Sequence, residues 1–177
     1  MGLFSRRRPE ASLARDVLRR ERPGERPLAV TTETYRGGLL VAGTTRVWVL
    51  DPGGSDGATV RLSRPWLDVL AGAWEPVTGT ISVTWVDGGR AAQWTLGPGG
   101  DRFSAVFYER VAASVLVDAV VVLDDAEVGR VAIRRDLSDS SLVEQIVPAR
   151  GVRRGDPQVA ALCGEVLAEL AESAGLR

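Results

Sequence analysis

Side chains able to act as a general base or a nucleophile are scarce in this sequence. The chain contains no histidine and no lysine, so all 22 of its basic residues are arginine. Histidine is the commonest general base near neutral pH and the commonest metal ligand. A serine or cysteine nucleophile would therefore lack the basic partner that usually takes up its proton. The inventory predicts that the protein is not an enzyme.

Cys163 is the only cysteine in the sequence. A single cysteine excludes both an intramolecular disulfide and a metal site built from several thiolates. Because Cys163 follows Leu162 in a segment of helical periodicity, we expect its thiol in the core rather than in an active site. The fold must then be held by packing, with no metal and no cofactor, which fits a reducing, cytoplasmic setting.

Two pairs of carboxylates could act as an acid and a base, namely Asp124 with Asp125 and Asp136 with Asp139. Both pairs lie in polar segments, where aspartate is common because its side chain hydrogen-bonds the local backbone. We interpret them as turn residues. The segment 97-GPGGD-101 could hold a phosphate, but it lacks the lysine and the surrounding pattern of a nucleotide-binding loop. We expect this segment to lead into a helix.

The charges are distributed unevenly along the chain. Residues 1–27 contain eight arginines and four acidic residues, a net charge of +4, whereas residues 28–177 carry −5. An acidic body does not favour binding to nucleic acid. The leader pairs apolar anchors with arginines that suit an anionic lipid surface, namely Leu3, Phe4, Arg6, Arg7 and Arg8. A disordered, solubilising terminus is the other interpretation, and we expect no secretory signal.

Residues 28–96 alternate between apolar and polar side chains in short segments separated by glycine and proline. Such alternation is typical of half-buried antiparallel strands. We count seven candidate strands, although 66–74 could be a short helix. Trp66 and Trp74 flank that segment and could line a binding groove, whereas the other tryptophans fall at positions that favour the core.

The apolar run 111–123 is too short to span a membrane, because a spanning helix needs about 20 apolar residues. Helical spacing over 101–113 predicts an amphipathic helix instead. After Ser114 the β-branched content rises, which favours a strand. The run therefore spans a transition from helix to strand.

The strand that begins after Ser114 should form an antiparallel hairpin with 128–135, because an acidic turn separates two apolar runs. Asp118 would then lie on one face of the hairpin. We expect its carboxylate to pair with Arg130 or Arg134 on the neighbouring strand.

The last third of the chain ends in a strongly patterned helix. A strand is expected over 142–149, followed by a helix that Asp156 caps and Pro157 begins, with Gly175 past its end. This helix has one apolar face, formed by Val159, Leu162, Val166, Leu167 and Leu170. That face must be covered, either by the sheet of the same chain or by a second copy.

Seven short strands followed by a helix over 101–113 resemble the pleckstrin-homology-like (PH-like) roll, in which a helix closes one end of a bent antiparallel sheet. Several segments are also similar to recurring segments of uncharacterised actinobacterial proteins with a PH-like domain. These are 24-GERPLAV-30, 39-LLVAGTTRVWVL-50, 65-PWLDVLAGAW-74, 109-ERVAASV-115, 130-RVAIRRD-136 and 156-DPQVAAL-162. The resemblance implies an α+β fold and brings no catalytic residue with it.

We therefore expect three parts: a basic leader over 1–27 that is partly disordered or forms a short helix, a PH-like roll with its capping helix over 28–113, and a hairpin, strand and amphipathic helix over 114–177. The expected function is non-catalytic binding or scaffolding, with a protein partner or a second copy of the chain as ligand. The alternative is a peripheral adaptor that docks to the inner membrane surface through the leader. An unrecognised enzyme ranks last.

Overall fold

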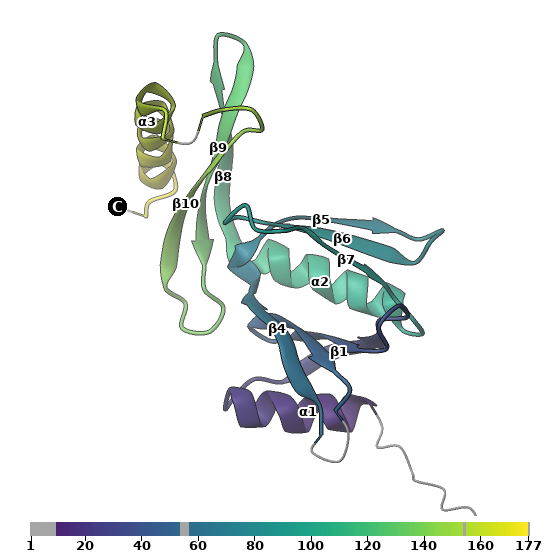
Figure 1. The fold of residues 1–177 in the computed structure, drawn as a ribbon. Coiled ribbons are helices and arrows are strands. Elements are labelled where there is room, and N and C mark those ends of the chain that lie inside the picture. The colour runs from purple at the N-terminus through teal and green to yellow at the C-terminus, as the bar shows by residue number, and fades with distance from the viewer. Residues whose placement is uncertain (1–9, 54–56, 154, 177) are drawn as a thin grey trace, which may run out of the picture. The chain divides into compact units, whose positions relative to one another are not determined.

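The computed structural model describes residues 10–53, 57–153 and 155–176 (Figure 1). The leader residues expected to meet a membrane, Leu3, Phe4, Arg6, Arg7 and Arg8, lie outside this described part. The chain divides into two compact units, residues 1–110 and 111–177, and each is considered by itself. Both units combine helices with antiparallel sheets, so the predicted α+β class is confirmed.

The first unit contains one helix, two sheets and the greater part of a second helix. Its elements are α1 (Glu10–Glu21), β1 (Pro27–Thr32), β2 (Leu39–Gly43), β3 (Arg46–Asp51), β4 (Thr59–Pro65), the 3-10 turn η1 (Trp66–Asp68), β5 (Val69–Glu75), β6 (Thr80–Trp85), β7 (Ala92–Thr95) and α2 (Gly100–Ser114). The strands pair in chain order as β1-β2-β3-β4 and as β5-β6-β7.

The prediction of a single rolled sheet is wrong, because the seven strands of the first unit form two sheets. The break falls at η1, where the chain leaves β4 and turns before β5 begins. The indole of Trp66 fixes this turn by donating a hydrogen bond to the carbonyl of Gly43 over 3.1 Å. At the opposite side, an isolated bridge between Glu33 and Leu96 joins the end of β1 to the end of β7.

The first sheet is covered on one face by α1 (Figure 1). Strands β2 and β3 are buried almost throughout, which explains why their sequences are nearly continuous apolar runs. Helix α1 contributes Ala14, Val17 and Leu18 to a cluster with side chains of that sheet, Leu39, Val41, Trp48 and Leu50. The leader therefore contains a helix that belongs to the folded unit, and its packing rather than its propensity holds it in place.

The predicted amphipathic helix is present as α2, and its two phenylalanines are fully buried. Phe107 meets the ring of Trp66 edge-on, with centroids 5.5 Å apart. The hydroxyl of Tyr108 accepts from the backbone N–H of Trp74 over 2.8 Å and donates to the carbonyl of Gly72 over 3.2 Å. Helix α2 is therefore fastened to β5 by both aromatic packing and hydrogen bonds.

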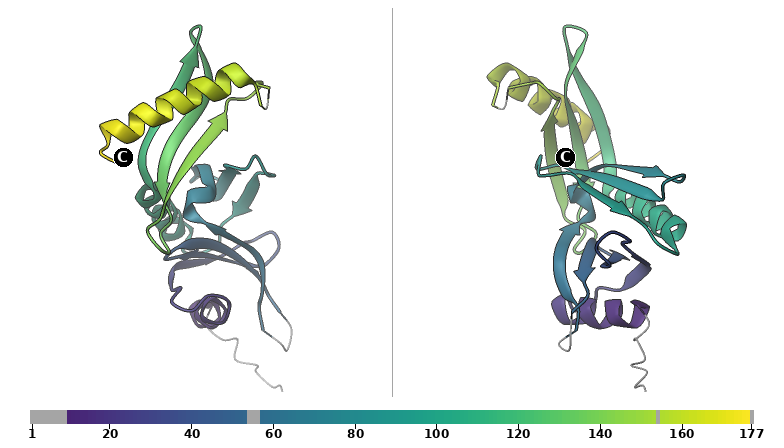
Figure 2. Two further views of the ribbon diagram at one scale, coloured as in Figure 1. Left: turned by 90° about the vertical axis from the view of Figure 1, so that its left-hand side faces the viewer. Right: turned by 45° about the vertical axis from the view of Figure 1, so that its right-hand side comes forward.

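The second unit is a three-stranded sheet covered by one helix. It comprises β8 (Val115–Leu123), β9 (Ala126–Arg135), β10 (Leu142–Pro148) and α3 (Pro157–Ser173), with strand order β10-β9-β8. The predicted hairpin is confirmed, and its tight turn has positive φ at both Asp124 and Asp125, as a two-residue hairpin loop of this kind requires. Figure 2 shows α3 lying across the three strands.

The sheet of the same chain covers the apolar face of α3, so no second copy is needed for that purpose. Val159, Cys163 and Leu167 are buried against residues of β8 and β9, including Val121 and Val131. The start of the helix also follows the prediction. The carboxylate of Asp156 accepts from the backbone N–H of Gln158 over 3.0 Å and of Val159 over 3.3 Å.

The expected ion pair of Asp118 is wrong. The register places Asp118 opposite Ala132, so Arg130 and Arg134 are its diagonal neighbours on β9 rather than directly opposite it. Arg130 pairs instead with Glu127 over 3.0 Å. Arg134 is buried and donates to the hydroxyl of Ser114, which leaves Asp118 exposed and without an ion pair to either arginine in the described part of the chain.

Candidate functional site

The two tryptophans expected to line a groove lie in different environments. Trp66 is 0% exposed and packs inside the first unit. Trp74 is half-buried in β5, and its backbone is engaged by Tyr108. Neither residue lines the cleft described below.

The remaining reactive groups of the second unit serve the fold. Cys163 is fully buried, and burial raises the pKa of its thiol, so its thiolate is disfavoured. Asp136 and Asp139 accept backbone hydrogen bonds from Ser138 and Ser141 over 2.8 and 2.9 Å, as turn aspartates do. Among the described residues, no group of three or more histidine, cysteine, aspartate or glutamate side chains could hold a metal ion.

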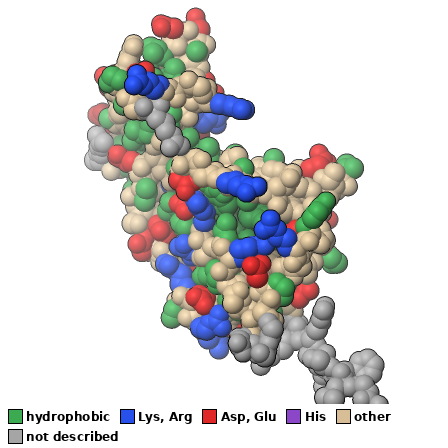
Figure 3. All heavy atoms as spheres, in the orientation of Figure 1, with side chains coloured by type: hydrophobic (Ala, Val, Ile, Leu, Met, Phe, Trp, Pro, Cys, Tyr) green, Lys and Arg blue, Asp and Glu red, His purple; other side chains and the backbone are tan. Residues whose placement is uncertain are grey.

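The first unit contains an open cleft with a volume of about 670 Å³. It lies between the loop after β1, the strands β3 and β4, and the strand β7 with the residues just before it. Figure 3 shows basic side chains gathered around apolar surface on this face of the unit. The lining residues are Glu33, Tyr35, Arg36, Val49, Arg61, Leu62, Arg90, Ala91, Ala92, Gln93, Trp94 and Thr95. The volume is in the range of sites that bind small ligands or short segments of protein.

Apolar side chains form the floor of the cleft. Val49 of β3 and Leu62 of β4 are directly opposite each other in the ladder, so their side chains lie on the same face of the first sheet. Trp94 of β7 completes the floor and is 7% exposed. The alternation of β7 turns Trp94 inward while its neighbour Gln93 stays exposed.

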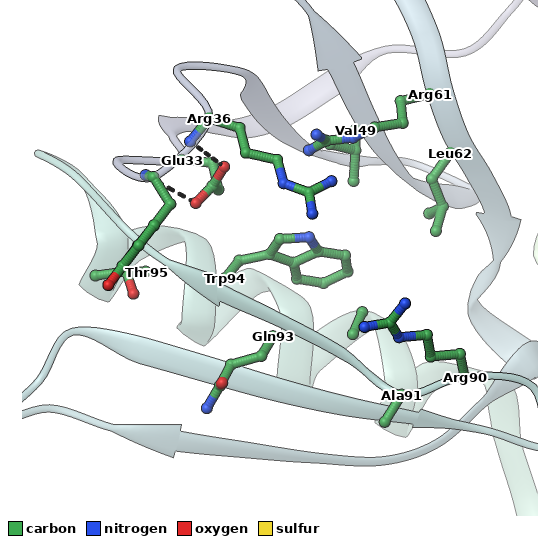
Figure 4. Close-up of a pocket in the computed structure, with 12 residues that line it drawn as sticks. Glu33, Arg36, Val49, Arg61, Leu62, Arg90, Ala91, Gln93, Trp94 and Thr95 are labelled. Carbon is green, nitrogen blue, oxygen red and sulfur yellow. Dashed lines mark hydrogen bonds between the residues drawn. The ribbon is translucent and has the colours of Figure 1, made fainter.

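Three arginines from three separate elements surround this floor (Figure 4). Arg61 is held by Asp51, whose carboxylate oxygen lies 3.2 Å from its guanidinium. Arg36 in the loop and Arg90 before β7 are exposed, and no acidic side chain of the described residues forms an ion pair with either. Two of the three guanidinium groups are therefore available to a ligand.

Among the described residues, Glu33 is the one acidic residue that lines the cleft, and its carboxylate is already engaged. It is 3% exposed, and it accepts the backbone N–H groups of Tyr35 and Arg36 over 2.9 and 2.8 Å. These hydrogen bonds close the turn that presents Arg36 (Figure 4). Glu33 therefore positions the arginine through the backbone rather than neutralising it.

The indole N–H of Trp94 is a further donor at the cleft. Figure 4 shows the nitrogen edge of its ring turned toward the side chain of Arg36. Within the described part of the chain this N–H makes no hydrogen bond. Arg36 and Arg90 flank Trp94, and none of these three side chains donates a hydrogen bond to the described residues, so their donors are open to a carboxylate or phosphate.

Sequence reasoning missed this site, because arginine is the only basic residue type and single arginines carried little weight. A signal was nevertheless present. Arg36 and Arg90 each lie in a short glycine-containing loop between strands, at 33-ETYRG-37 and 87-DGGR-90. Binding residues often lie on loops that a rigid sheet holds in place, so the two arginine-containing loops were the sequence signal for this site.

None of the helices in the described residues is both long enough and apolar enough to cross a membrane. Comparison of the chain with models of protein families finds no match. Comparison with curated proteins finds no match either.

Proposed function

We propose that the chain is a non-catalytic binding domain whose cleft recognises an anionic group on a protein partner. The observation that carries this proposal is that Arg36 and Arg90 flank the apolar floor on either side of Trp94, and that none of these three side chains has a hydrogen-bond or ion-pair partner among the described residues. A ligand that pairs a carboxylate or phosphate with an apolar group satisfies both features. A nucleophile with an adjacent base is not part of the lining, so binding rather than turnover is what these residues support.

The expected affinity is modest and depends on salt. Arg36 and Arg90 are exposed, and exposed ion pairs each contribute about 0.2–1 kcal/mol. The apolar floor adds about 25 cal/mol for each Å² that a ligand covers. Because the charged part is screened, raising the ionic strength should weaken binding and slow association.

We also propose that residues 27–114 form a PH-like domain. Four antiparallel strands, then three, then a helix packed on β5 follow the order of elements in that fold. The two sheets are joined at one corner by the bridge between Glu33 and Leu96. In this arrangement α2 and the cleft belong to the same small unit. The shape of the cleft is then set by the packed sheets rather than by one flexible loop.

Titration with inorganic pyrophosphate tests the proposal. Binding by the wild-type chain should be weakened up to about fivefold in each of Arg36→Gln and Arg90→Gln, which remove the two unpaired charges. Arg102→Gln is the matched control, because Arg102 is an exposed arginine of the same unit that does not line the cleft. If all three variants bind pyrophosphate as the wild type does, the cleft is not the site.

A second candidate function is docking to an anionic membrane surface, and α1 gives it some support. Arg15 and Arg19 lie on one side of α1, next to the face that packs on the sheet, and Arg22 follows directly after the end of the helix; the described residues provide no acidic partner for these arginines. They extend the basic character of the leader into the folded unit. Co-sedimentation with phosphatidylserine vesicles should then weaken in the Arg15→Gln/Arg19→Gln variant and stay unchanged in Arg36→Gln.

A further inference from the structure

Strand β7 has a free edge that faces the cleft. In its sheet it pairs with β6 alone, so one row of its backbone groups has no strand beside it. Residues 91–95 all line the cleft, which therefore runs along this edge. An unpaired edge is a template for a further extended segment.

The hydrogen bonds of β7 show which backbone groups are turned outward. The carbonyl of Thr95 accepts from the backbone N–H of Thr34 over 2.9 Å, whereas the N–H of Leu96 donates to Gly79 at the other side over 2.7 Å. Because the direction alternates along an antiparallel strand, Trp94 bonds to β6 and Gln93 points its N–H and carbonyl to the free edge. Among the described residues, no backbone partner meets Gln93 on that edge.

The side chain of Gln93 does not obstruct this edge. It bonds to the hydroxyl of Ser82 on the neighbouring strand over 3.3 Å. Figure 4 shows it pointing away from Trp94. The backbone of Gln93 is thus left open to the cleft, between Arg36 near one end of β7 and Arg90 near the other.

We infer that the partner of this cleft is an extended acidic peptide segment that adds as a strand to β7; this inference rests on the function proposed above. Its backbone pairs with the N–H and carbonyl of Gln93, and alternate side chains point toward the floor formed by Val49, Leu62 and Trp94. Five residues of strand span about 14 Å between the first and the last, the length of edge that residues 91–95 offer. Acidic side chains at the first and fifth positions then meet Arg36 and Arg90.

A lipid headgroup or a free phosphate would use the arginines but leave the strand edge unused. The edge is what favours a polypeptide, because only a backbone presents a donor and an acceptor at the spacing of a strand. The apolar floor favours a small apolar residue at the third position, which faces the same side as the two acidic residues.

The probe is an acetylated and amidated pentapeptide of the sequence Glu-Thr-Val-Thr-Glu, titrated into the full chain. Its matched control is Thr-Glu-Val-Glu-Thr, which has the same composition and charge but places the acidic side chains on the opposite face. A third peptide carries N-methyl groups on the two threonine nitrogens of the first sequence, which blocks backbone pairing and leaves both carboxylates. We expect the first peptide to bind at least tenfold more tightly than either of the others.

Two variants test the protein side. Gln93→Pro removes the outward N–H without removing a bond to β6, and proline is tolerated at such an edge position. It should weaken the first peptide at least tenfold and leave pyrophosphate binding unchanged, whereas Gln93→Ala, which loses the side chain alone, should bind both as the wild type does. Should Gln93→Pro fail to fold, the N-methylated peptide with wild-type protein gives the same information.

The outcomes separate the two proposals. Equal binding of the N-methylated and unmodified peptides overturns the strand addition and leaves the anion-binding cleft intact. Binding of pyrophosphate without binding of any peptide does the same. If neither pyrophosphate nor the first peptide binds, both the inference and the proposed function are wrong.

Discussion

Gly72 of β5 has no room for a side chain, because the ring of Phe107 in α2 lies over it. A Cβ at Gly72 would approach the Cε1 atom of Phe107 to 2.6 Å and the Cζ atom to 3.3 Å. The φ angle of Gly72 is not positive, so the substitution Gly72→Ala brings overlap without backbone strain. It therefore tests how tightly α2 is packed on the second sheet of the first unit.

The overlap fixes the size of the effect. Ordinary contact begins at 3.4 Å, so the ring of Phe107 has to move by about 0.8 Å. Phe107 is fully buried, with the Trp66 ring 5.5 Å away and the Phe103 ring 6.3 Å away, which leaves little space for that movement. Overpacking of this kind costs about 1–3 kcal/mol, and we expect Gly72→Ala to lower the free energy of unfolding of the first unit by about 2 kcal/mol.

The sequence provides a separate probe for each unit. All five tryptophans lie in the first unit, and the single cysteine, Cys163, is buried in the second. Tryptophan fluorescence in urea therefore reports the first unit, and pulsed labelling of the thiol reports the second. With a urea dependence of about 2 kcal/mol per molar, Gly72→Ala should lower the fluorescence midpoint by about 1 M and leave the labelling of Cys163 unchanged.

The same substitution in the Phe107→Leu background identifies the cause. Leucine is smaller than phenylalanine, so the added methyl group should cost clearly less there than in the wild type, and the double-mutant cycle should give a coupling of more than about 0.5 kcal/mol. A cost of Gly72→Ala that is the same in both backgrounds, or below about 0.5 kcal/mol in the wild type, would refute the packing of Phe107 over β5.

Four further predictions concern stability and pH. Gly164→Ala in α3, where a Cβ meets nothing within 4 Å, should stabilise the second unit by about 0.5–1 kcal/mol and slow the labelling of the Cys163 thiol. Asp156→Ala removes the cap of the same helix and should lower the free energy of unfolding of this unit by about 1 kcal/mol, measured in the same way. Because burial raises the pKa of Cys163 above 9.0, the stability this thiol contributes is present below pH 9.0 and is lost as the pH rises past it, which urea unfolding at pH 8 and pH 10 would show. The backbone N–H of Gly89 and then Arg64 hold the pKa of Asp87 below 3.8, so its contribution is lost as the pH falls through the lowered value, and Arg64→Gln should raise that pKa in a carboxyl titration by NMR.

The elements that could be predicted from sequence are those whose signals are local. Asp156 and Pro157 mark the start of α3, and two adjacent turn aspartates mark the loop between β8 and β9. Their stabilising hydrogen bonds join residues within a few positions of each other, so the sequence contains the whole interaction. The helix α2 was predictable for the same reason, since its buried residues recur at helical spacing.

The features that sequence did not predict depend on contacts between distant residues. The division into two sheets occurs at η1, where Trp66 bonds to Gly43, 23 positions earlier. The ion pair expected for Asp118 is absent because the two arginines diagonal to it have other partners, Glu127 for Arg130 and the hydroxyl of Ser114 for Arg134. A short helix was expected in the leader, whereas the packing of α1 on the first sheet was not.

The cleft differs from the rest of the first unit in what its arginines lack. Arg64 is satisfied by Asp87 at 2.8 Å and lies over the ring of Trp85 at 4.7 Å, so its charge and its planar face are both used by the fold. Arg36 and Arg90 form neither an ion pair nor a cation–π contact with the described residues, although both border the apolar floor of the cleft. A ligand that covers the apolar floor would exclude water from it. An ion pair between such an arginine and an incoming anion would then be stronger, because it forms in a lower dielectric than water. Composition does not distinguish one arginine from another. The interaction partner of each arginine does, and it separates those that stabilise the fold from Arg36 and Arg90, which we assign to binding.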